Sequence, residues 1–402
     1  MPYRPFAHVE QAPPDPIMGL TELFRNDSNP DKINLSIGVY QDDNGVNPVF
    51  RSVKQAERRL LEEENTKSYL PIGGEPRYGE LVRELVFGKG HALVSDGRAV
   101  TLHTPGGTGA LRLGAEFLKE QFPERTLWLS DPTWPNHKGV FGNAGLTMES
   151  YPYYDPETHG MRFDDMLEAL ERVPDGDVVL LHGCCHNPTG VDPTPEQWQK
   201  LAELFARRDL IPYFDFAYQG LGTGLEEDAV GVRTFADKGL CLLVSSSFSK
   251  NFGLYRERVG ALTIVSGDAD EAARVASRVK IVARRAYSNP PAHGGKAVEV
   301  VLTDPELRKE WEDEVRQVRQ RILSMRELFV QKLKELGVSR DFGFLMEQKG
   351  MFSFSGIGRE EVLRLREEYG IYMSENGRIN VAGMTTGNID YLCNAIARVL
   401  RG

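Results

Sequence analysis

Residues 245–253 read SSSFSKNFG and follow the apolar run LCLLV of residues 240–244, with Arg258 eight positions after Lys250. A lysine that comes directly after a buried strand and among hydroxyl groups suits an amine that can be neutral. A Schiff base with a carbonyl compound needs such an amine. Ser247 and Arg258 offer a hydroxyl and a bidentate cation to a phosphate group. The alternative is an ordinary surface lysine in a polar turn.

Around this stretch, short apolar runs alternate with helical patterns from about residue 100 to residue 265. The expected strands are residues 126–130, 178–182, 211–214, 240–245 and 260–265. A helical pattern at residues 195–208 lies between two of them. This alternation predicts an α/β domain with a mostly parallel sheet.

Polar motifs follow several of these strands, where open α/β sheets bind ligands. Asp215 ends one strand and Tyr218 follows it. A carboxylate there could keep a pyridinium nitrogen protonated, or it could cap a helix. Asn187, in HGCCHNPTG at residues 182–190, is expected to direct its amide into the site. The Cys and His residues of this motif match no common zinc spacing, so we expect no metal.

A glycine-rich turn, PGGTG at residues 105–109, opens a helical run at residues 110–122. Its backbone N–H groups and the helix N-terminus favour an anion. The turn lacks the spacing of a dinucleotide fingerprint and the lysine of a P-loop, which disfavours a nucleotide-binding oxidoreductase. Trp134, in DPTWPNH at residues 131–137, is placed either to stack on a flat ring or to pack in the core.

The length of 402 residues predicts two domains. One amphipathic helix that ends at Gly337 is expected to lead into a smaller α+β domain. Its apolar positions are Trp311, Val315, Val318, Ile322, Met325, Phe329, Leu333 and Leu336.

Composition limits the partners and the compartment. The net charge of -10 disfavours nucleic acid and anionic membrane surfaces. No apolar run reaches the ~20 residues of a membrane helix, and residues 1–20 resemble neither a signal nor a transit peptide. Two of the four cysteines are adjacent, which is typical of a reducing compartment, so we expect a cytoplasmic protein. The proline-rich N-terminus is either a frayed tail or an arm on a partner subunit.

Together these motifs resemble the aspartate aminotransferase family, the class-I, fold-type-I pyridoxal-phosphate enzymes. The matching segments, in the family's order, include YLPIGG, TPGGTGALR, DPTWPNH, HGCCHNPTG, PYFDFAYQG, SFSKNFGLYRERVG, YSNPPAHG, GMFSFSG and GRINVAGMTTGN. The resemblance implies a mostly parallel seven-stranded sheet between helices in a large domain at residues 45–310. It further implies a discontinuous small domain at residues 14–44 and 311–402 and an arm at residues 1–13 that reaches a partner subunit.

The resemblance also implies a homodimer with shared active sites that bind pyridoxal phosphate. Lys250 would carry the cofactor and move the substrate proton, and Asp215 would pair with the pyridine nitrogen. Tyr218 and Asn187 would hydrogen-bond the ring hydroxyl, and Trp134 would stack on the ring. The phosphate would be held by Gly107, Thr108, Ser247, Arg258 and the partner's Tyr69.

Amino acids and 2-oxo acids would be the substrates. Trp134 and Asn187 would also line their site, together with three further residues. Gly38 would present its backbone, Arg378 would bind the α-carboxylate, and Arg284 from the partner would bind a side-chain carboxylate. By spacing alone, each arginine is most simply a surface residue.

The implied reaction is reversible amino transfer between L-aspartate and 2-oxoglutarate, giving oxaloacetate and L-glutamate. The alternative is an aromatic-amino-acid aminotransferase. Val39, Thr108 and Asn289 favour the aspartate type, whereas Gln41, Asn47 and Ser68 fit neither type. Gly106 stands where some members have serine, so one phosphate-binding hydroxyl is expected to be missing. A binding protein that kept the fold without the chemistry is disfavoured because the catalytic residues are all present.

Overall fold

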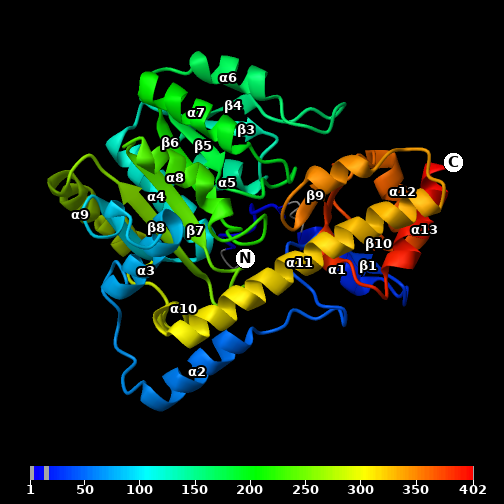
Figure 1. Cartoon of the computed structure of the whole chain (residues 1–402), viewed down its shortest axis with the longest axis horizontal. Helices are drawn as coiled ribbons and strands as arrows, with labels where there is room; N and C mark the ends of the chain where they lie inside the picture. The colour runs from blue at the N-terminus through cyan, green and yellow to red at the C-terminus, as the bar shows by residue number, and fades with distance from the viewer. Residues whose placement is uncertain (1–3, 13–17, 402) are drawn as a thin grey trace.

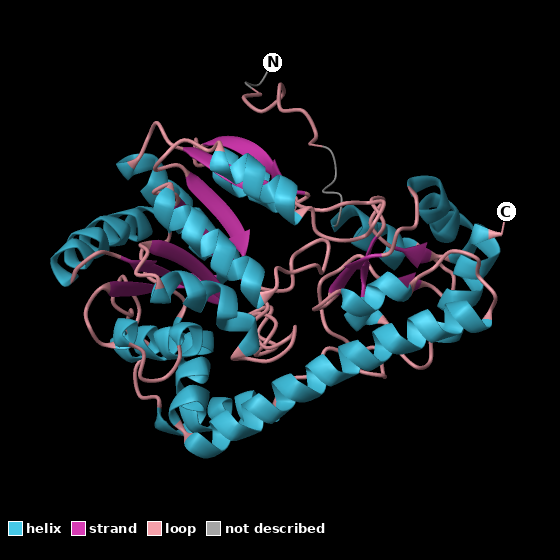
Figure 2. Cartoon of the chain, turned by 45° about the horizontal axis from the view of Figure 1, so that its top comes forward, coloured by secondary structure: helices cyan, strands magenta, loops and turns pink. Residues whose placement is uncertain are grey.

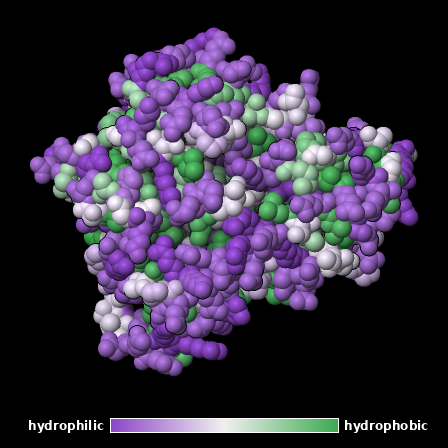
Figure 3. Space-filling model, in the orientation of Figure 1, coloured by the Kyte–Doolittle hydropathy of each residue, from purple (hydrophilic) through white to green (hydrophobic). Residues whose placement is uncertain are grey.

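The computed structural model describes residues 4–12 and 18–401. The chain forms two lobes that are joined by the long helix α11 (Pro305–Glu335), yellow in Figure 1. The larger lobe contains the main sheet, and the smaller lobe contains two short two-stranded sheets. Polar residues dominate the face seen in Figure 3, with apolar residues in small groups among them.

The main sheet has seven strands in the order β2-β8-β7-β6-β5-β3-β4. In that order the strands are Ala99–Pro105, Val259–Val265, Leu242–Ser247, Ile211–Phe216, Val178–His182, Thr126–Asp131 and Thr147–Pro152. Six of these strands run in one direction, and β8 alone runs in the opposite direction. The predicted mostly parallel seven-stranded sheet is therefore confirmed, and each of the five expected strands is present.

Helices cover both faces of this sheet, as Figure 2 shows. The alternation of side chains along β5 separates the two faces. Val178 and Leu180 pack with α4 (Gly106–Gln121), α5 (Asn136–Gly142) and α9 (Ala269–Ala286). Val179 and Leu181 belong to the opposite core, with α3 (Pro76–Phe87), α6 (Phe163–Glu171), α7 (Pro195–Arg207) and α8 (Val230–Asp237). Burial on both sides explains why the central strands are apolar throughout.

The smaller lobe combines the two ends of the chain. β1 (Ile33–Asn34) pairs in parallel with β10 (Ile371–Tyr372), and β9 (Phe352–Phe354) pairs antiparallel with β11 (Arg378–Asn380). The remaining helices of this lobe are α1 (Met18–Asn26), α12 (Arg359–Tyr369) and α13 (Ile389–Leu400). The exact domain limits stay a prediction, and the boundary at residues 310 and 311 falls inside α11.

The N-terminal arm predicted at residues 1–13 lies partly outside the described residues. Its described part, residues 4–12, projects beyond the helices and strands in Figure 2. Phe6 is 80% exposed and Val9 is 65% exposed, so this segment carries apolar side chains that its own chain leaves uncovered. Among residues 4–12 and 18–401, no helix has both the length and the apolar composition needed to cross a membrane.

The predicted long helix is confirmed, although it begins earlier than its apolar pattern. Asp304 caps α11 by accepting the backbone N–H groups of Glu306 at 2.9 Å and Leu307 at 3.0 Å. At the other end, Gly337 adopts a φ of 70°, a conformation that glycine takes at little cost. In the larger lobe, α11 packs against α2 (Arg51–Glu63) and α10 (Ala292–Thr303).

Glu314 anchors α2 to this long helix. Its carboxylate accepts the backbone N–H of Arg51 at 2.5 Å and the backbone N–H and hydroxyl of Ser52 at 3.2 and 2.6 Å. These bonds satisfy donors at the start of α2, where no intrahelical partner exists. The carboxylate therefore supplies, from a distant part of the chain, the cap that α2 lacks locally.

We predict that Glu314→Ala lowers the free energy of unfolding by about 2–3 kcal/mol, because charge-assisted hydrogen bonds to buried donors are lost. Glu312→Ala is the matched control: it removes a carboxylate two residues away whose ion pair with Arg308 is exposed, and it should cost less than about 0.5 kcal/mol. Denaturant unfolding of both variants measures the difference. Equal losses in the two variants would show that Glu314 does not cap α2.

Candidate active site

A cavity of about 770 Å³ opens at the carboxyl ends of β5, β6 and β7, where the two lobes meet. Most of the predicted site residues line it: Gly38, Gly107, Thr108, Trp134, Asn187, Asp215, Tyr218, Ser247, Lys250, Arg258 and Arg378. Its walls also include residues that the sequence motifs did not single out, among them Leu111, Asn136, Ser249, Tyr255 and Phe352. The predicted Tyr69 and Arg284 do not line it.

One end of the cavity is built for an anion. The helix α4 begins there, so its first backbone N–H groups have no intrahelical acceptor. A Cβ on Gly107 would lie 2.9 Å from the Ser247 Cβ, which shows how closely β7 approaches the helix. The hydroxyl of Ser247 and the guanidinium of Arg258 line the same cavity.

Gly106 is required at the first position of this helix. Its φ is 76°, and a Cβ there would lie 2.5 Å from the Arg258 Nη2. A serine in this backbone conformation would be strained and would displace the cation. Ser249, which lines the cavity and accepts a hydrogen bond from Arg258 Nη1 at 3.3 Å, places a second hydroxyl beside the cation. A hydroxyl thus lies beside the cation even though residue 106 is glycine.

Lys250 lies centrally in the cavity. Its Nζ is 4.6 Å from the centre of the Tyr218 ring. Burial lowers the pKa of Lys250 to about 8; the charge of Asp215 opposes this effect, and the charge of Arg258 adds to it. An amine with this pKa is neutral in about one molecule in ten at pH 7, far more often than an ordinary lysine, which makes it available as a nucleophile and a base.

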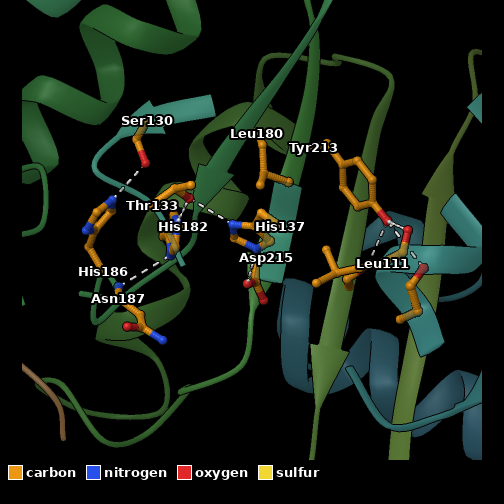
Figure 4. Close-up of polar contacts among 12 residues, drawn as sticks. Leu111, Ser130, Thr133, His137, Leu180, His182, His186, Asn187, Tyr213 and Asp215 are labelled. Carbon is orange, nitrogen blue, oxygen red and sulfur yellow. Dashed lines mark hydrogen bonds and ion pairs between the residues drawn. The ribbon is translucent and has the colours of Figure 1, made fainter. Parts of the chain in front are cut away.

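Asp215 ends a chain of hydrogen bonds that is drawn in Figure 4. Its Oδ2 lies 3.0 Å from His137 Nε2, and His137 Nδ1 lies 2.8 Å from the Thr133 hydroxyl. That hydroxyl is 3.2 Å from His182 Nε2, and His182 Nδ1 accepts the Asn187 backbone N–H at 3.4 Å. One arrangement satisfies every contact: each Nε2 carries a proton, and Thr133 donates to His137.

This chain keeps Asp215 ionised. Burial acts to raise the pKa of Asp215, but the hydrogen bond and charge of His137, together with His182 and Lys250, lower it below the ordinary value. Burial and the neighbouring His137 lower the pKa of His182 to about 3, so His182 is neutral. The site therefore holds an ionised carboxylate at the end of β6 that is fixed by a hydrogen bond from His137.

The sequence motifs did not assign His137 or His182 a function. The strand register would have indicated a function for His182, because His182 of β5 lies directly opposite Asp215 of β6. A nearby histidine, His186, has structural contacts instead. It stacks on Tyr153 with a ring distance of 4.0 Å and hydrogen-bonds the Ser130 and Thr189 hydroxyls.

Arg378 provides a buried cation at the smaller lobe's side of the cavity. It is 3% exposed, and its guanidinium lies 4.2 Å from the centre of the Phe352 ring. Nη1 donates to Asn187 Oδ1 at 3.2 Å and Nη2 donates to the Ser36 carbonyl at 2.8 Å, whereas the buried Nε has no partner. In the described part of the chain, no carboxylate pairs with Arg378 or Arg258. Both cations are thus available to anionic groups of a ligand.

Tyr69 and Arg284 belong to one surface region. Tyr69 is 90% exposed, and Arg284 is also exposed and donates to the Ser288 hydroxyl. A hydrogen bond of 2.6 Å from Asn289 Nδ2 to the Leu70 carbonyl connects their segments. The expectation that both residues act in the site of a partner subunit stays a prediction.

Cys184, Cys185 and Asp228 form a cluster that the sequence spacing did not indicate. Their ligand atoms lie within 4.8 Å of one another. The Asp228 carboxylate, however, already accepts backbone N–H groups from Gly220, Gly222, Thr223 and Gly224. The Asp228 carboxylate therefore stabilises the backbone of its own loop.

The lowered pKa of Lys250 gives a direct prediction for cofactor-free protein. Acetylation of Lys250, followed by mass spectrometry, should rise with pH with a midpoint near 8, well below the ~10.4 of a free lysine. Asp215→Asn should lower this midpoint further, because the aspartate charge stabilises the ammonium. Asp209→Asn, an exposed control, should leave it unchanged. A wild-type midpoint near 10 would refute the proposed electrostatics.

Comparison with known proteins identifies the family. The family model of aminotransferase class I and II matches residues 30–396. An aspartate aminotransferase from Escherichia coli K12 is 55% identical over 98% of this chain and 100% of that protein. A crystal structure of an aromatic-amino-acid aminotransferase from Burkholderia pseudomallei, covalently bound to pyridoxal phosphate, has a TM-score of 0.97 and 49% identity over 99% of this chain and all of that one.

A further solved structure extends this similarity. An aromatic amino acid aminotransferase from Psychrobacter sp. B6, cocrystallised with aspartic acid, has a TM-score of 0.96 and 46% identity over 99% of this chain and 100% of that one. Sequence, fold and pocket thus agree, and this chain belongs to the class I and II aminotransferases.

Proposed function

We propose that the protein is a pyridoxal-phosphate-dependent aspartate aminotransferase. It would transfer an amino group reversibly between L-aspartate and 2-oxoglutarate, giving oxaloacetate and L-glutamate. The observation that carries this proposal is a lysine amine with a pKa of about 8 that shares one cavity with an ionised buried carboxylate and two cations without carboxylate partners. The aspartate aminotransferase from Escherichia coli, 55% identical, supports the choice of substrate.

The cavity residues fit pyridoxal phosphate group by group. The N-terminus of α4 at Gly107 and Thr108, with Ser247, Ser249 and Arg258, would hold the phosphate. Asp215 would hold the pyridine nitrogen, Tyr218 and Asn187 the ring hydroxyl, and Trp134 a face of the ring. Lys250 would bind the aldehyde carbon. When bound, the cofactor withdraws electrons from the substrate α-carbon and so makes its proton acidic.

The protein's own groups then have distinct tasks. The Asp215 carboxylate, fixed by His137, keeps a proton on the ring nitrogen. Once released from the aldehyde carbon, the neutral Lys250 amine would take the proton from the substrate α-carbon and pass it to the cofactor's aldehyde carbon, as a base with a pKa near the working pH does efficiently. Arg378 orients the substrate by its α-carboxylate, using a planar guanidinium that offers parallel donors.

A second subunit would complete each site. In a homodimer, Tyr69 would reach the phosphate and Arg284 the side-chain carboxylate of a substrate bound to the partner. The exposure of both residues, their common surface region and their absence from their own cavity support this arrangement. The arm at residues 1–13 would lie on the partner, and the enzyme would work in the cytoplasm.

An aromatic-amino-acid aminotransferase is the second candidate, because solved structures with that name have TM-scores of 0.97 and 0.96 with this chain. Steady-state rates on L-aspartate and L-phenylalanine, each with 2-oxoglutarate as acceptor, separate the two. We expect a higher kcat/KM for aspartate and no turnover by Lys250→Ala. Higher kcat/KM for phenylalanine would reassign the substrate, and turnover by Lys250→Ala would remove the proposed base.

The two arginines should differ in their effects on specificity. Arg378→Ala should lower kcat/KM for every amino acid, because every substrate has an α-carboxylate. Arg284→Ala should affect aspartate and glutamate far more than phenylalanine. Loss of a charge-assisted pair in a closed site costs about 2–5 kcal/mol, or about 30- to several thousand-fold in kcat/KM. If Arg284→Ala lowered activity on phenylalanine and aspartate equally, it would not bind the side-chain carboxylate.

Subunit mixing tests the shared site. Arg284→Ala subunits and Lys250→Ala subunits should each be poor with aspartate, yet a mixed dimer should contain one site with an intact Lys250 and the partner's intact Arg284. We predict that activity on aspartate recovers when the two proteins exchange subunits. No recovery, with exchange demonstrated by mass spectrometry, would place Arg284 outside the partner's site.

A further inference from the structure

Residues 36–41 form a strap that passes over the cavity and contributes Gly38 to its lining. The strap has almost no regular structure of its own, so side chains from elsewhere must fix its position. Gly38 approaches Phe352 so closely that a Cβ at residue 38 would lie 2.6 Å from the Phe352 Cζ. Small movements of the strap would therefore change the shape of the substrate site.

The smaller lobe holds the strap at several points. Asn380 Nδ2 donates to the carbonyls of Ile37 at 2.6 Å and Val39 at 2.9 Å. The Gln41 N–H donates to the Ala382 carbonyl at 3.0 Å. Arg378, the cation assigned to the substrate, donates Nη2 to the Ser36 carbonyl at 2.8 Å. The direction of the Arg378 guanidinium thus depends on where the strap lies.

The contacts of the strap with residues outside the smaller lobe are fewer, and one of them runs from Asn47 Nδ2 to the Tyr40 carbonyl at 3.0 Å. In the described part of the chain, one hydrogen bond joins the strap to the segment that follows β7 and carries Lys250. It runs from the Tyr40 backbone N–H to the Tyr255 hydroxyl, at 3.1 Å. The Tyr255 carbonyl, in turn, accepts Arg258 Nη1 at 3.1 Å. Tyr255 therefore contacts the strap through its side chain and the phosphate-binding cation through its backbone.

We propose that Tyr255 is a positioning residue whose hydroxyl fixes the strap over the cavity and, through Ser36, aligns Arg378 with the substrate α-carboxylate. This inference rests on the proposed function of the cavity. The Tyr255 hydroxyl then contributes to substrate affinity, whereas the Tyr255 carbonyl and Arg258 contribute to cofactor binding. Burial raises the pKa of Tyr255, so the hydroxyl keeps its proton across the working pH range.

Tyr255→Phe tests this assignment because it removes only the oxygen. KM for L-aspartate should rise about 2- to 10-fold, the range of one neutral hydrogen bond, with kcat within about twofold of the wild type. The Kd of succinate, a dicarboxylate that cannot react, should rise by the same factor, and the cofactor content should not change. Tyr391→Phe is the matched control, since its hydroxyl donates to the Tyr369 carbonyl at 2.8 Å in the smaller lobe, outside the cavity lining.

Hydrogen–deuterium exchange gives a readout that does not depend on turnover. The peptide containing Tyr40 should exchange faster in Tyr255→Phe than in the wild type and in Tyr391→Phe. Unchanged exchange together with unchanged KM would overturn the role of Tyr255. So would an equal rise in KM in the Tyr391 control. A wild-type protein without transaminase activity would instead refute the proposed function, and the exchange experiment would still decide whether Tyr255 holds the strap.

Discussion

The hydrogen bond between His137 Nε2 and Asp215 Oδ2, 3.0 Å long, is the interaction on which the rest of the site depends. A carboxylate at the end of a buried strand would favour its neutral form if it were left alone. Here the hydrogen bond from His137, itself held through Thr133 and His182, keeps it ionised. The negative charge of Asp215 partly offsets the effect of burial on the nearby Lys250 amine, so the pKa of Lys250 does not fall further.

The cavity also contains two positively charged side chains, Arg258 and Arg378. The chain carries a net charge of -10, yet Arg258 and Arg378 face the cavity with no carboxylate partner among the described residues. Arg258 is exposed, but Arg378 is buried, and a buried cation without a partner is costly unless a ligand supplies the anion. Arg258 would bind a phosphate and Arg378 a carboxylate, and the reactive amine of Lys250 lies in the same cavity. Binding of an anion to Arg378 would therefore stabilise the folded protein.

Much of this architecture could be predicted from the sequence, because burial leaves a strong pattern. Strand β5 is buried at each position and reads as an apolar run that ends at His182. The edge strand β4 has the sequence TMESYP and is largely exposed, so it gave no such signal. The long helix was recognised by its apolar positions, but its first turns precede them and are defined by the Asp304 cap.

The site was predictable where chemistry lies in local motifs, and not where it depends on contacts between distant segments. Asp215 lies near the end of β6, Asn187 and Lys250 follow β5 and β7, and the fold brings the three together. The pairing of His182 with Asp215 requires the strand register, and the bond from Tyr40 to Tyr255 spans 215 positions. The contributions proposed for Tyr69 and Arg284 depend on contacts between two subunits.

The central claim is that Lys250 is the amine that binds the cofactor, and covalent labelling tests it most directly. The protein, purified with pyridoxal phosphate and reduced with borohydride, is digested and its peptides are mapped by mass spectrometry. We expect a phosphopyridoxyl adduct on Lys250 in nearly every chain, with loss of the label in Lys250→Ala. A label found mainly on another lysine, or an unlabelled Lys250 in protein that retains the cofactor, would contradict it.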